Sequence, residues 1–305
     1  MRRFTLLLLI ALAVTPSADA RNADEPWLVE WTMVDVSPPG VSGDAHLLRF
    51  ADGTNILIDT GFEPQARERV LPALRRAAVD RLDLLVITHA HTNHYGGLPT
   101  LLDSGIAVGE IVFNRPDPAA CDAEQPWGCN RGHIAQAFAA AAAHGVPVRS
   151  AARGDVLYRG EAGGTELRVL YAFDGANTPV GRTSINDTSL IMRLEAGPTS
   201  VLLAADLDLK LGRYLAAEGE ELRADILKVP HHGMESAAPD AFLDRVAARA
   251  ALVPGPAGEW DGDRGERLRR YFERHSVPVY VSGVVGDVVV KIGPAGYRIT
   301  TERGK

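Results

Sequence analysis

Apolar residues recur along the chain in short blocks with two different periods. Continuous or alternating apolar blocks predict β-strands, and blocks with apolar residues three or four positions apart predict helices. The expected strands are 28–36, 45–50, 55–59, 83–88, 110–114, 147–149, 156–158, 167–172, 188–195, 200–205, 225–230, 251–254 and most of 277–301. The expected helices are 63–78, 98–103, 134–144, 209–217, 240–249 and 265–275.

The order of these elements indicates two similar halves. Each half begins with a hairpin, one turned on Asp52-Gly53 and the other on Gly197-Pro198, and continues with strand and helix units. Strands 83–88 and 225–230 are almost continuously apolar, which is typical of strands buried on both faces. We therefore expect an α/β fold in which two sheets pack face to face and helices cover their outer faces, a four-layer αββα sandwich.

The first twenty residues have the features of an export signal. Arg2 and Arg3 precede an apolar run of roughly ten residues, which is too short to span a bilayer. Ala18-Asp19-Ala20 has the small-x-small form of a signal peptidase site. We expect a signal peptide over 1–20 and a single periplasmic or secreted domain over 21–305 that does not enter the membrane. An N-terminal membrane anchor is the alternative.

Composition adds a constraint on the substrate. The 305 residues are 46% apolar and 23% charged, an ordinary globular balance, with a formal net charge of −7. Removal of 1–20 leaves 30 basic and 38 acidic residues, a net charge of −8. Because a negative field repels polyanions, a small-molecule or phosphodiester substrate is favoured over nucleic acid. The sequence leaves the oligomeric state open.

The two cysteines, Cys121 and Cys129, lie eight positions apart in a loop rich in proline and glycine, 115–132. In an oxidising compartment this spacing predicts a disulfide, and two free thiols are the alternative. The chain has no Cys-x-x-Cys pair, so a cysteine-based metal site is not expected.

Histidines follow two of the buried strands. His89, His91 and His94 come directly after one strand, and His231 and His232 come directly after another. The carboxyl ends of parallel strands meet at one edge of a sheet, which is where sites form in such folds. The two histidine clusters are therefore expected to converge.

A carboxylate joins this set. Asp206 follows the apolar strand 200–205, and a lone carboxylate is costly to bury without a counter-charge. A metal ion supplies that charge, and imidazole suits zinc, manganese and iron. A surface loop explains any one histidine pair equally well, but three such strand ends together predict a metal site.

The first histidine cluster, His-x-His-x-x-His after an apolar strand, resembles the first motif of the metallo-β-lactamase superfamily. The upstream Ile58-Asp59-Thr60-Gly61 is similar to that family's Asp-x-Gly strand end. Among its branches, the chain most resembles the C-terminal hydrolase domain of ComEC-type DNA-uptake proteins, over about residues 30 to 300. The branch motifs are matched by Asn186-Asp187-Thr188-Ser189-Leu190, Ala205-Asp206 and Leu227-Lys228-Val229-Pro230-His231-His232-Gly233.

The resemblance implies roles for individual residues and a zinc cofactor, one or two ions per chain, with manganese as an alternative. His89 and His91 would bind the first metal, and Asp206 would bridge two metals. His94 and one of His231 or His232 would bind the second metal. We assign His231 as the ligand and place His232 against substrate oxygen, although the motif leaves the two interchangeable. Asp59 would orient a ligand histidine.

The implied activity is hydrolysis of a phosphodiester or a related ester. A metal lowers the pKa of bound water enough to give hydroxide near neutral pH, and that hydroxide would attack phosphorus or carbonyl carbon. Asp206, His232 and Asn93 would form the catalytic centre. A degenerate relative that binds a ligand or partner with little chemistry is the alternative, and β-lactam hydrolysis is a weaker third reading because fold does not fix substrate.

Two departures from the family pattern bear on activity. Asn93 stands where the family has aspartate, so a second metal is expected to bind weakly or not at all. The branch also has a Gly-His-Pro segment after the strand that corresponds to 251–254, and 259–263 contains no histidine. Three further residues are expected at the substrate rim: Asn186, Trp127 and Arg182.

Overall fold

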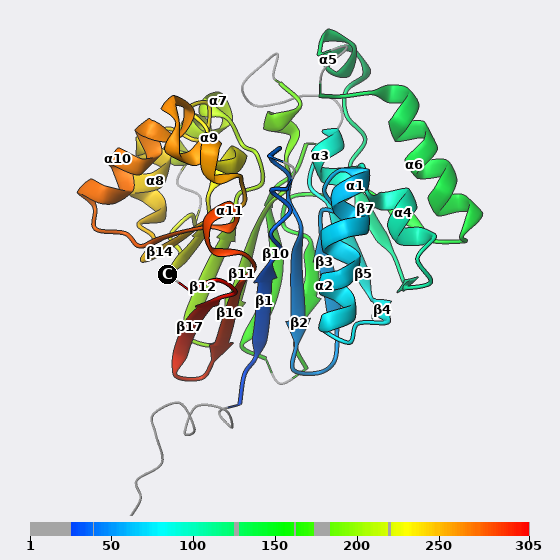
Figure 1. The fold of residues 1–305 in the computed structure, drawn as a ribbon, viewed down its shortest axis with the longest axis horizontal. Helices are drawn as coiled ribbons and strands as arrows, with labels where there is room; N and C mark the ends of the chain where they lie inside the picture. The colour runs from blue at the N-terminus through cyan, green and yellow to red at the C-terminus, as the bar shows by residue number, and fades with distance from the viewer. Residues whose placement is uncertain are drawn as a thin grey trace, which may run out of the picture.

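The computed structural model describes residues 26–38, 40–124, 128–161, 163–173, 184–218 and 221–304. Within these residues two mixed sheets pack face to face, and helices lie on the outer face of each sheet (Figure 1). The expected four-layer α/β architecture is thus confirmed. The expected signal peptide, 1–20, lies outside the described residues. None of the described helices has both the length and the apolar character needed to cross a membrane.

The first sheet has eight strands in the order β17-β16-β1-β2-β3-β5-β7-β8. Strands β3, β5, β7 and β8 run parallel, and the others pair antiparallel. The bounds are β1 Val29–Met33, β2 His46–Phe50, β3 Asn55–Ile58, β5 Leu84–Ile87, β7 Ile111–Phe113, β8 Val148–Arg149, β16 Val288–Gly293 and β17 Gly296–Thr301. A separate two-stranded ribbon joins β4 (Arg81–Leu82) to β6 (Ala107–Val108).

The second sheet has seven strands in the order β15-β14-β13-β12-β11-β10-β9. Strands β12 to β15 run parallel, and β9 to β12 pair antiparallel. The bounds are β9 Val156–Arg159, β10 Thr165–Tyr171, β11 Ile191–Ala196, β12 Thr199–Leu203, β13 Ile226–Lys228, β14 Ala250–Val253 and β15 Val279–Val281.

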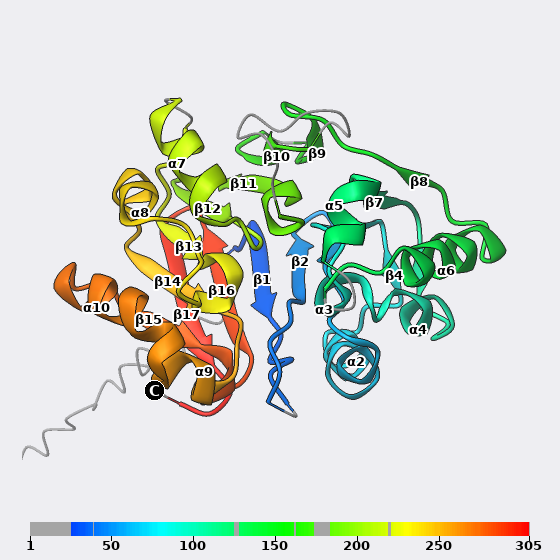
Figure 2. The same cartoon turned by 90° about the horizontal axis from the view of Figure 1, so that it is seen from above.

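The helices divide between the two outer faces. Seen from above, α2, α4 and α6 lie beside the first sheet, and α7, α8, α9 and α10 lie beside the second (Figure 2). The bounds are α1 Glu63–Gln65, which continues through a π-helical turn at Ala66–Val70 into α2 Leu71–Arg76, then α3 Thr92–Tyr95, α4 Leu98–Leu102, α5 Pro118–Ala123, α6 Arg131–Ala143, α7 Leu209–Ala217, α8 Asp240–Val246, α9 Ala257–Asp261, α10 Glu266–Arg274 and α11 Ser282–Val285. Single 3₁₀ turns cover Asn186–Thr188, Pro230–Gly233 and Asp263–Gly265.

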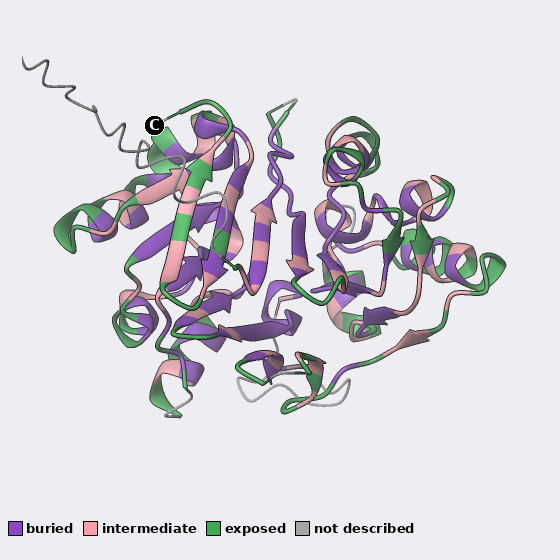
Figure 3. Cartoon of the chain, turned by 90° about the horizontal axis from the view of Figure 1, so that it is seen from below, coloured by how far each residue is buried: buried purple, intermediate pink, exposed green. Residues whose placement is uncertain are grey.

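Apolar side chains form three layers of core. One cluster lies between the sheets, and one lies between each sheet and its helices. The central strands are accordingly buried along most of their length, whereas edge strands such as β17 and the outer sides of the helices are more exposed (Figure 3). Both sheets are therefore covered on two faces, which explains the continuous apolar runs of β5 and β13.

Three segments differ from the sequence-based expectation. The loop 115–132 contains α5, which begins with Pro118 after Asp117, whose carboxylate accepts from the Ala120 N–H. Residues 259–263, which the sequence suggests are a loop after the strand 251–254, include the last three residues of α9. The last two strands also return to the first sheet, where β16 pairs with β1, so the sheets do not follow a strict division of the chain into halves.

Cys121 and Cys129 form a disulfide, with Cα atoms 5.1 Å apart. Both residues are fully buried in the core between the first sheet and its helices. The disulfide predicted from the sequence is present, and it closes a segment that begins in α5 and ends before α6.

Replacing both cysteines, as C121A/C129A, is expected to lower the free energy of unfolding by roughly 2–3 kcal/mol, because the short closed loop restricts the unfolded chain. Urea unfolding of the oxidised wild type and the variant measures this difference. Equal midpoints and equal slopes for the two proteins would contradict it.

Candidate metal centre

The site lies where the two sheets meet at the carboxyl ends of their central parallel strands. Asp59 follows β3, and His89 follows β5, in the first sheet. Asp206 follows β12, and His232 follows β13, in the second sheet. The two strand-end clusters that are far apart in sequence therefore share one edge of the molecule, near α3 in Figure 1.

Asp206 is the centre of this cluster. One of its oxygens, Oδ2, lies 3.1 Å from His94 Nε2, 3.1 Å from His232 Nε2 and 4.0 Å from His89 Nε2. All four side chains are buried. Three imidazole nitrogens and a carboxylate oxygen thus face a common point, which is a donor set that zinc and manganese accept.

The outward nitrogens of His94 and His232 are held by acceptors. His94 Nδ1 lies 2.8 Å from Asp59 Oδ2, and His232 Nδ1 lies 3.0 Å from the Pro254 carbonyl oxygen. A proton on each Nδ1 leaves Nε2 to face Asp206. Fixing a ring through its outer nitrogen is how proteins orient metal-binding histidines.

His89 and His91 are held in the same way. Thr88 Oγ1 donates to Asp59 at 2.8 Å, so its lone pair is free to accept from His89 Nδ1 at 3.1 Å. His91 Nε2 lies 2.7 Å from Glu124 Oε2, and His91 Nδ1 lies 3.2 Å from His89 Nε2. Each ring again keeps one nitrogen free of these outer partners: His89 Nε2 faces Asp206, and His91 Nδ1 faces His89.

A buried lysine balances the carboxylates. Lys228 Nζ is paired with Asp44 Oδ2, lies 3.4 Å from Asp206 Oδ1 and donates to the Ala205 carbonyl at 2.7 Å. Burial alone lowers the pKa of a lysine, but Asp44 and Asp206 outweigh that effect and raise the pKa of Lys228. Lys228 is therefore a cation inside the protein.

The pKa shifts of the cluster follow from the same charges. Burial raises the pKa of Asp206, but His232, His94 and Lys228 outweigh it and hold that pKa well below its usual value. Burial lowers the pKa of a histidine, but Asp206 and a second carboxylate raise the pKa of His94 to about 10 and that of His232 to about 9. His89 lacks such a close carboxylate, and burial with its histidine neighbours lowers its pKa.

These protonation states match the charge of a divalent cation. Three buried carboxylates, those of Asp44, Asp59 and Asp206, face Lys228 and the protons held by two histidines. A divalent cation that replaced those two protons would leave the net charge of the buried cluster unchanged. Three overlapping groups have donor atoms within 4.8 Å of one another: His89, His94 and Asp206; Asp44, Asp59 and His94; and Asp44, Asp206 and His232.

The structure places the two adjacent histidines the other way round from the expectation. His232 points at Asp206, whereas His231 Nδ1 lies 3.0 Å from Asp208 Oδ1 and 2.7 Å from Ser236 Oγ, outside the cluster. The reason is the backbone: His231 and His232 have φ values of 46° and 53°, a left-handed turn that points their side chains apart. His232, and not His231, therefore lies in the buried histidine–aspartate cluster.

Asn93 and Asn186 each contact one of the two adjacent histidines. Asn93 Nδ2 lies 3.0 Å from His232 Nε2 and donates to the Ser42 carbonyl at 3.3 Å. Asn186, which is expected at the substrate rim, has its Nδ2 3.3 Å from His231 Nε2. The other two expected rim residues, Trp127 and Arg182, lie outside the described residues.

Sequence reasoning missed three charged residues of the site. Lys228 could have been found from the sequence, because it is a lysine within an apolar run that predicts a buried strand. A buried charge is rarely without a partner, so this position indicates a nearby carboxylate. Asp44 precedes β2 and Glu124 follows α5, and neither position has a sequence pattern that separates it from an ordinary surface acid.

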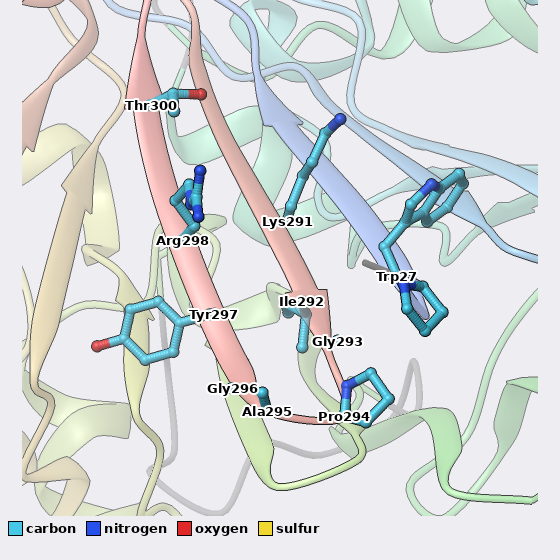
Figure 4. Close-up of a pocket in the computed structure, with 11 residues that line it drawn as sticks. Trp27, Lys291, Ile292, Gly293, Pro294, Ala295, Gly296, Tyr297, Arg298 and Thr300 are labelled. Atoms are coloured by element: carbon cyan, nitrogen blue, oxygen red, sulfur yellow. The ribbon is translucent and has the colours of Figure 1, made fainter. Parts of the chain in front are cut away.

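A hollow elsewhere on the surface has different chemistry. It lies along the β16–β17 hairpin, where Trp27, Lys291, Tyr297 and Arg298 contribute to its lining (Figure 4). The register pairs Ile292 with Val29, at the far end of β1 from His46, so this hollow is at the opposite end of the sheet from the histidines. Its described lining contains no histidine or carboxylate, and we do not associate it with the metal centre.

Comparison with known proteins agrees with this geometry. The family model described as metallo-beta-lactamase superfamily matches residues 38–112. The chain is 25% identical over 213 residues to ComE operon protein 3 of Bacillus subtilis (strain 168), covering 70% of this chain and 25% of that protein. It is 24% identical over 266 residues to competence protein ComA of Neisseria gonorrhoeae, covering 84% of this chain and 32% of that protein.

The chain spans about a quarter to a third of the length of these relatives. Among solved structures, a mutant of the CmlA beta-hydroxylase is similar with a TM-score of 0.52 at 15% identity, covering 91% of this chain and 57% of that one. This similarity concerns the fold alone. With two mixed sheets between helices and a buried histidine–aspartate cluster, the chain has a metallo-β-lactamase fold, and it is a distant homologue of the ComE operon protein 3 and ComA competence proteins.

Proposed function

We propose that this chain is a metal-dependent hydrolase of an ester, with phosphodiesters as the substrate class and zinc as the metal, and with manganese as the alternative ion. One observation carries the proposal. The nitrogens of His89, His94 and His232 face Asp206, and each ring is fixed from outside by an acceptor. A structural cluster has no need to direct three imidazole nitrogens to one carboxylate oxygen.

Different residues of the site have different proposed roles. His89, His91, His94, His232 and Asp206 would hold one or two ions. A bound ion would supply a nucleophile at neutral pH by lowering the pKa of water, and would polarise the ester.

The residues around this donor set support it in two ways. Lys228 keeps Asp206 ionised and in place. Asn186, whose amide nitrogen lies 3.3 Å from Nε2 of the 19% exposed His231 side chain, would offer a hydrogen-bond donor to a substrate oxygen.

The substrate and compartment are part of the same proposal. The names of the relatives refer to competence, but the negative charge of this chain disfavours a polyanion, so we propose a small phosphodiester in place of nucleic acid. The buried disulfide supports export to the periplasm or the medium, where such bonds persist.

Activity is tested with purified protein that lacks residues 1–20, loaded with zinc or with manganese. We expect metal-dependent hydrolysis of bis(p-nitrophenyl) phosphate, and we expect His89→Ala to reduce it at least about 100-fold because a ligand is removed. His144→Ala is the matched control, since His144 is exposed and pairs with Asp103 away from the site. Metal per chain is measured in the same samples.

Asn93 favours a second candidate function, a binding protein with little chemistry. Its neutral amide occupies the family's aspartate position and contacts His232. The proposal of hydrolysis fails if neither metal-loaded wild type nor Asn93→Asp cleaves phosphodiesters or carboxyl esters. Hydrolysis that depends on His89 excludes the binding-only function.

A further inference from the structure

Glu124 stands at the end of α5, inside the segment that the Cys121–Cys129 disulfide closes. Its two carboxylate oxygens have different partners. Oε2 lies 2.7 Å from His91 Nε2, and Oε1 accepts from the Ile185 N–H at 2.8 Å. The side chain of Glu124 is 25% exposed and that of His91 is 15% exposed, so this contact is mostly shielded from water.

The contact determines which nitrogen of His91 faces the metal centre. The two nitrogens lie on different edges of the ring, and the Nδ1 edge is 3.2 Å from His89 Nε2. A carboxylate accepts hydrogen bonds and cannot donate, so His91 carries its proton on Nε2, toward Glu124. The lone pair of Nδ1 then points into the cluster.

The other end of the closed segment also contacts His91. A side-chain carbon at Gly128 would lie 3.0 Å from His91 Nε2 and 3.0 Å from Glu124 Oε2, and the φ of Gly128 is 78°, so a larger residue there would be crowded and strained. The Gly128 carbonyl accepts from Thr92 Oγ1 at 3.2 Å. Both described ends of the segment therefore lie against the His91–Thr92 corner, and the disulfide holds them together.

We propose that Glu124 is a positioning residue of the metal centre, which fixes His91 with Nδ1 as its ligand atom. The inference rests on the proposed metal-binding function and adds to it a residue that lies outside the histidine motif. In this role the disulfide-closed segment does more than add stability, because it delivers the carboxylate that orients His91.

Two variants separate the parts of this contact. Glu124→Ala removes the acceptor, and a lost outer partner of a ligand histidine typically weakens metal binding 10–100-fold, so we expect zinc affinity to fall by about that factor. Glu124→Gln keeps one acceptor oxygen for the two donors, His91 Nε2 and the Ile185 N–H, so a smaller loss of zinc affinity is expected. Zinc affinity is measured by competition with a chromophoric chelator, which needs no turnover.

Asp122→Asn is the matched control. Asp122 lies in the same closed segment, and its carboxylate pairs with Arg131 on the surface instead of with a histidine. Its zinc affinity is expected to equal that of wild type. Imidazole ¹⁵N spectra of the zinc-loaded protein provide a second readout, in which wild-type His91 shows a protonated Nε2 and a metal-bound Nδ1, and Glu124→Ala loses that pattern.

The outcomes distinguish this inference from the proposed function. If wild type binds zinc, and Glu124→Ala and Glu124→Gln bind it with the same affinity, the role of Glu124 is overturned and the proposed function stays intact. An equal loss in Asp122→Asn also overturns it, because the effect would then belong to the segment as a whole. Absence of zinc binding in wild type overturns both. If Glu124→Ala does not fold, Glu124→Gln and the His91 spectrum decide the question.

Discussion

Replacing Lys228 with methionine is expected to lower the free energy of unfolding of the metal-free protein by about 3–5 kcal/mol. Methionine fills a similar volume, so the loss comes from charge and not from a cavity. Lys228 is 1% exposed and contacts both Asp44 and Asp206, and removing one partner of a buried ion pair leaves the other charge without compensation. Urea unfolding after dialysis against a chelator measures the change.

The control for this variant is Lys210→Met, at an exposed position on α7. It is expected to change the free energy of unfolding by less than about 0.5 kcal/mol. A similar small change in Lys228→Met would show that Asp44 and Asp206 are neutral in the metal-free protein, and the charge balance proposed for the cluster would be wrong.

The topological part of the site could be predicted from the sequence. His89 and Asp206 each follow an apolar strand within three residues, His94 lies in the short helix α3 just beyond His89, and parallel strands place their carboxyl ends at one edge. This rule depends only on strand direction, so the predicted edge stays the same when the predicted strand bounds are wrong by one or two residues. The position of Asp59 as the partner of His94 follows from the same rule together with the family motif.

The local geometry could not be predicted in the same way. His231 and His232 are adjacent in sequence, and only the left-handed backbone at both residues decides which one faces Asp206. Asp59 and Ala205, which also have positive φ, show that such backbone conformations gather at this edge. No hydrophobic pattern encodes them, because the tertiary contacts of the site hold these residues in place.

Glu124 illustrates a second limit. The cysteine spacing predicts the disulfide correctly, but α5 lies within what the sequence presents as an irregular loop. The carboxylate reaches His91 only because α5 ends beside α3, a contact between segments about thirty residues apart. Residues that orient ligands are found from packing, whereas the ligands themselves are found from motifs.

Metal affinity is expected to rise steeply with pH, because the metal must displace protons. His94 and His232, with pKa values raised to about 10 and about 9, are both protonated at neutral pH in the metal-free protein. If both bind the same ion, about two protons are released per metal, and the dissociation constant falls about 100-fold per pH unit between roughly pH 6 and 8. Calorimetry in buffers of different ionisation enthalpy counts the protons.

The stability of the metal-free protein has the opposite dependence. A raised pKa means that the folded state holds the proton more tightly than the unfolded state, whose histidines have the ordinary value of 6.5. The contribution of His94 and His232 to stability is therefore complete below about pH 6.5 and is lost as the pH rises through about 9 and 10. Asp44 and Asp206, whose pKa values are lowered, lose their contribution to stability only when the pH falls into the acidic range.

Metal-loaded protein should keep its stability above pH 9, since the cation replaces both protons. Equal pH profiles with and without metal, together with no proton release, would show that His94 and His232 are not ligands.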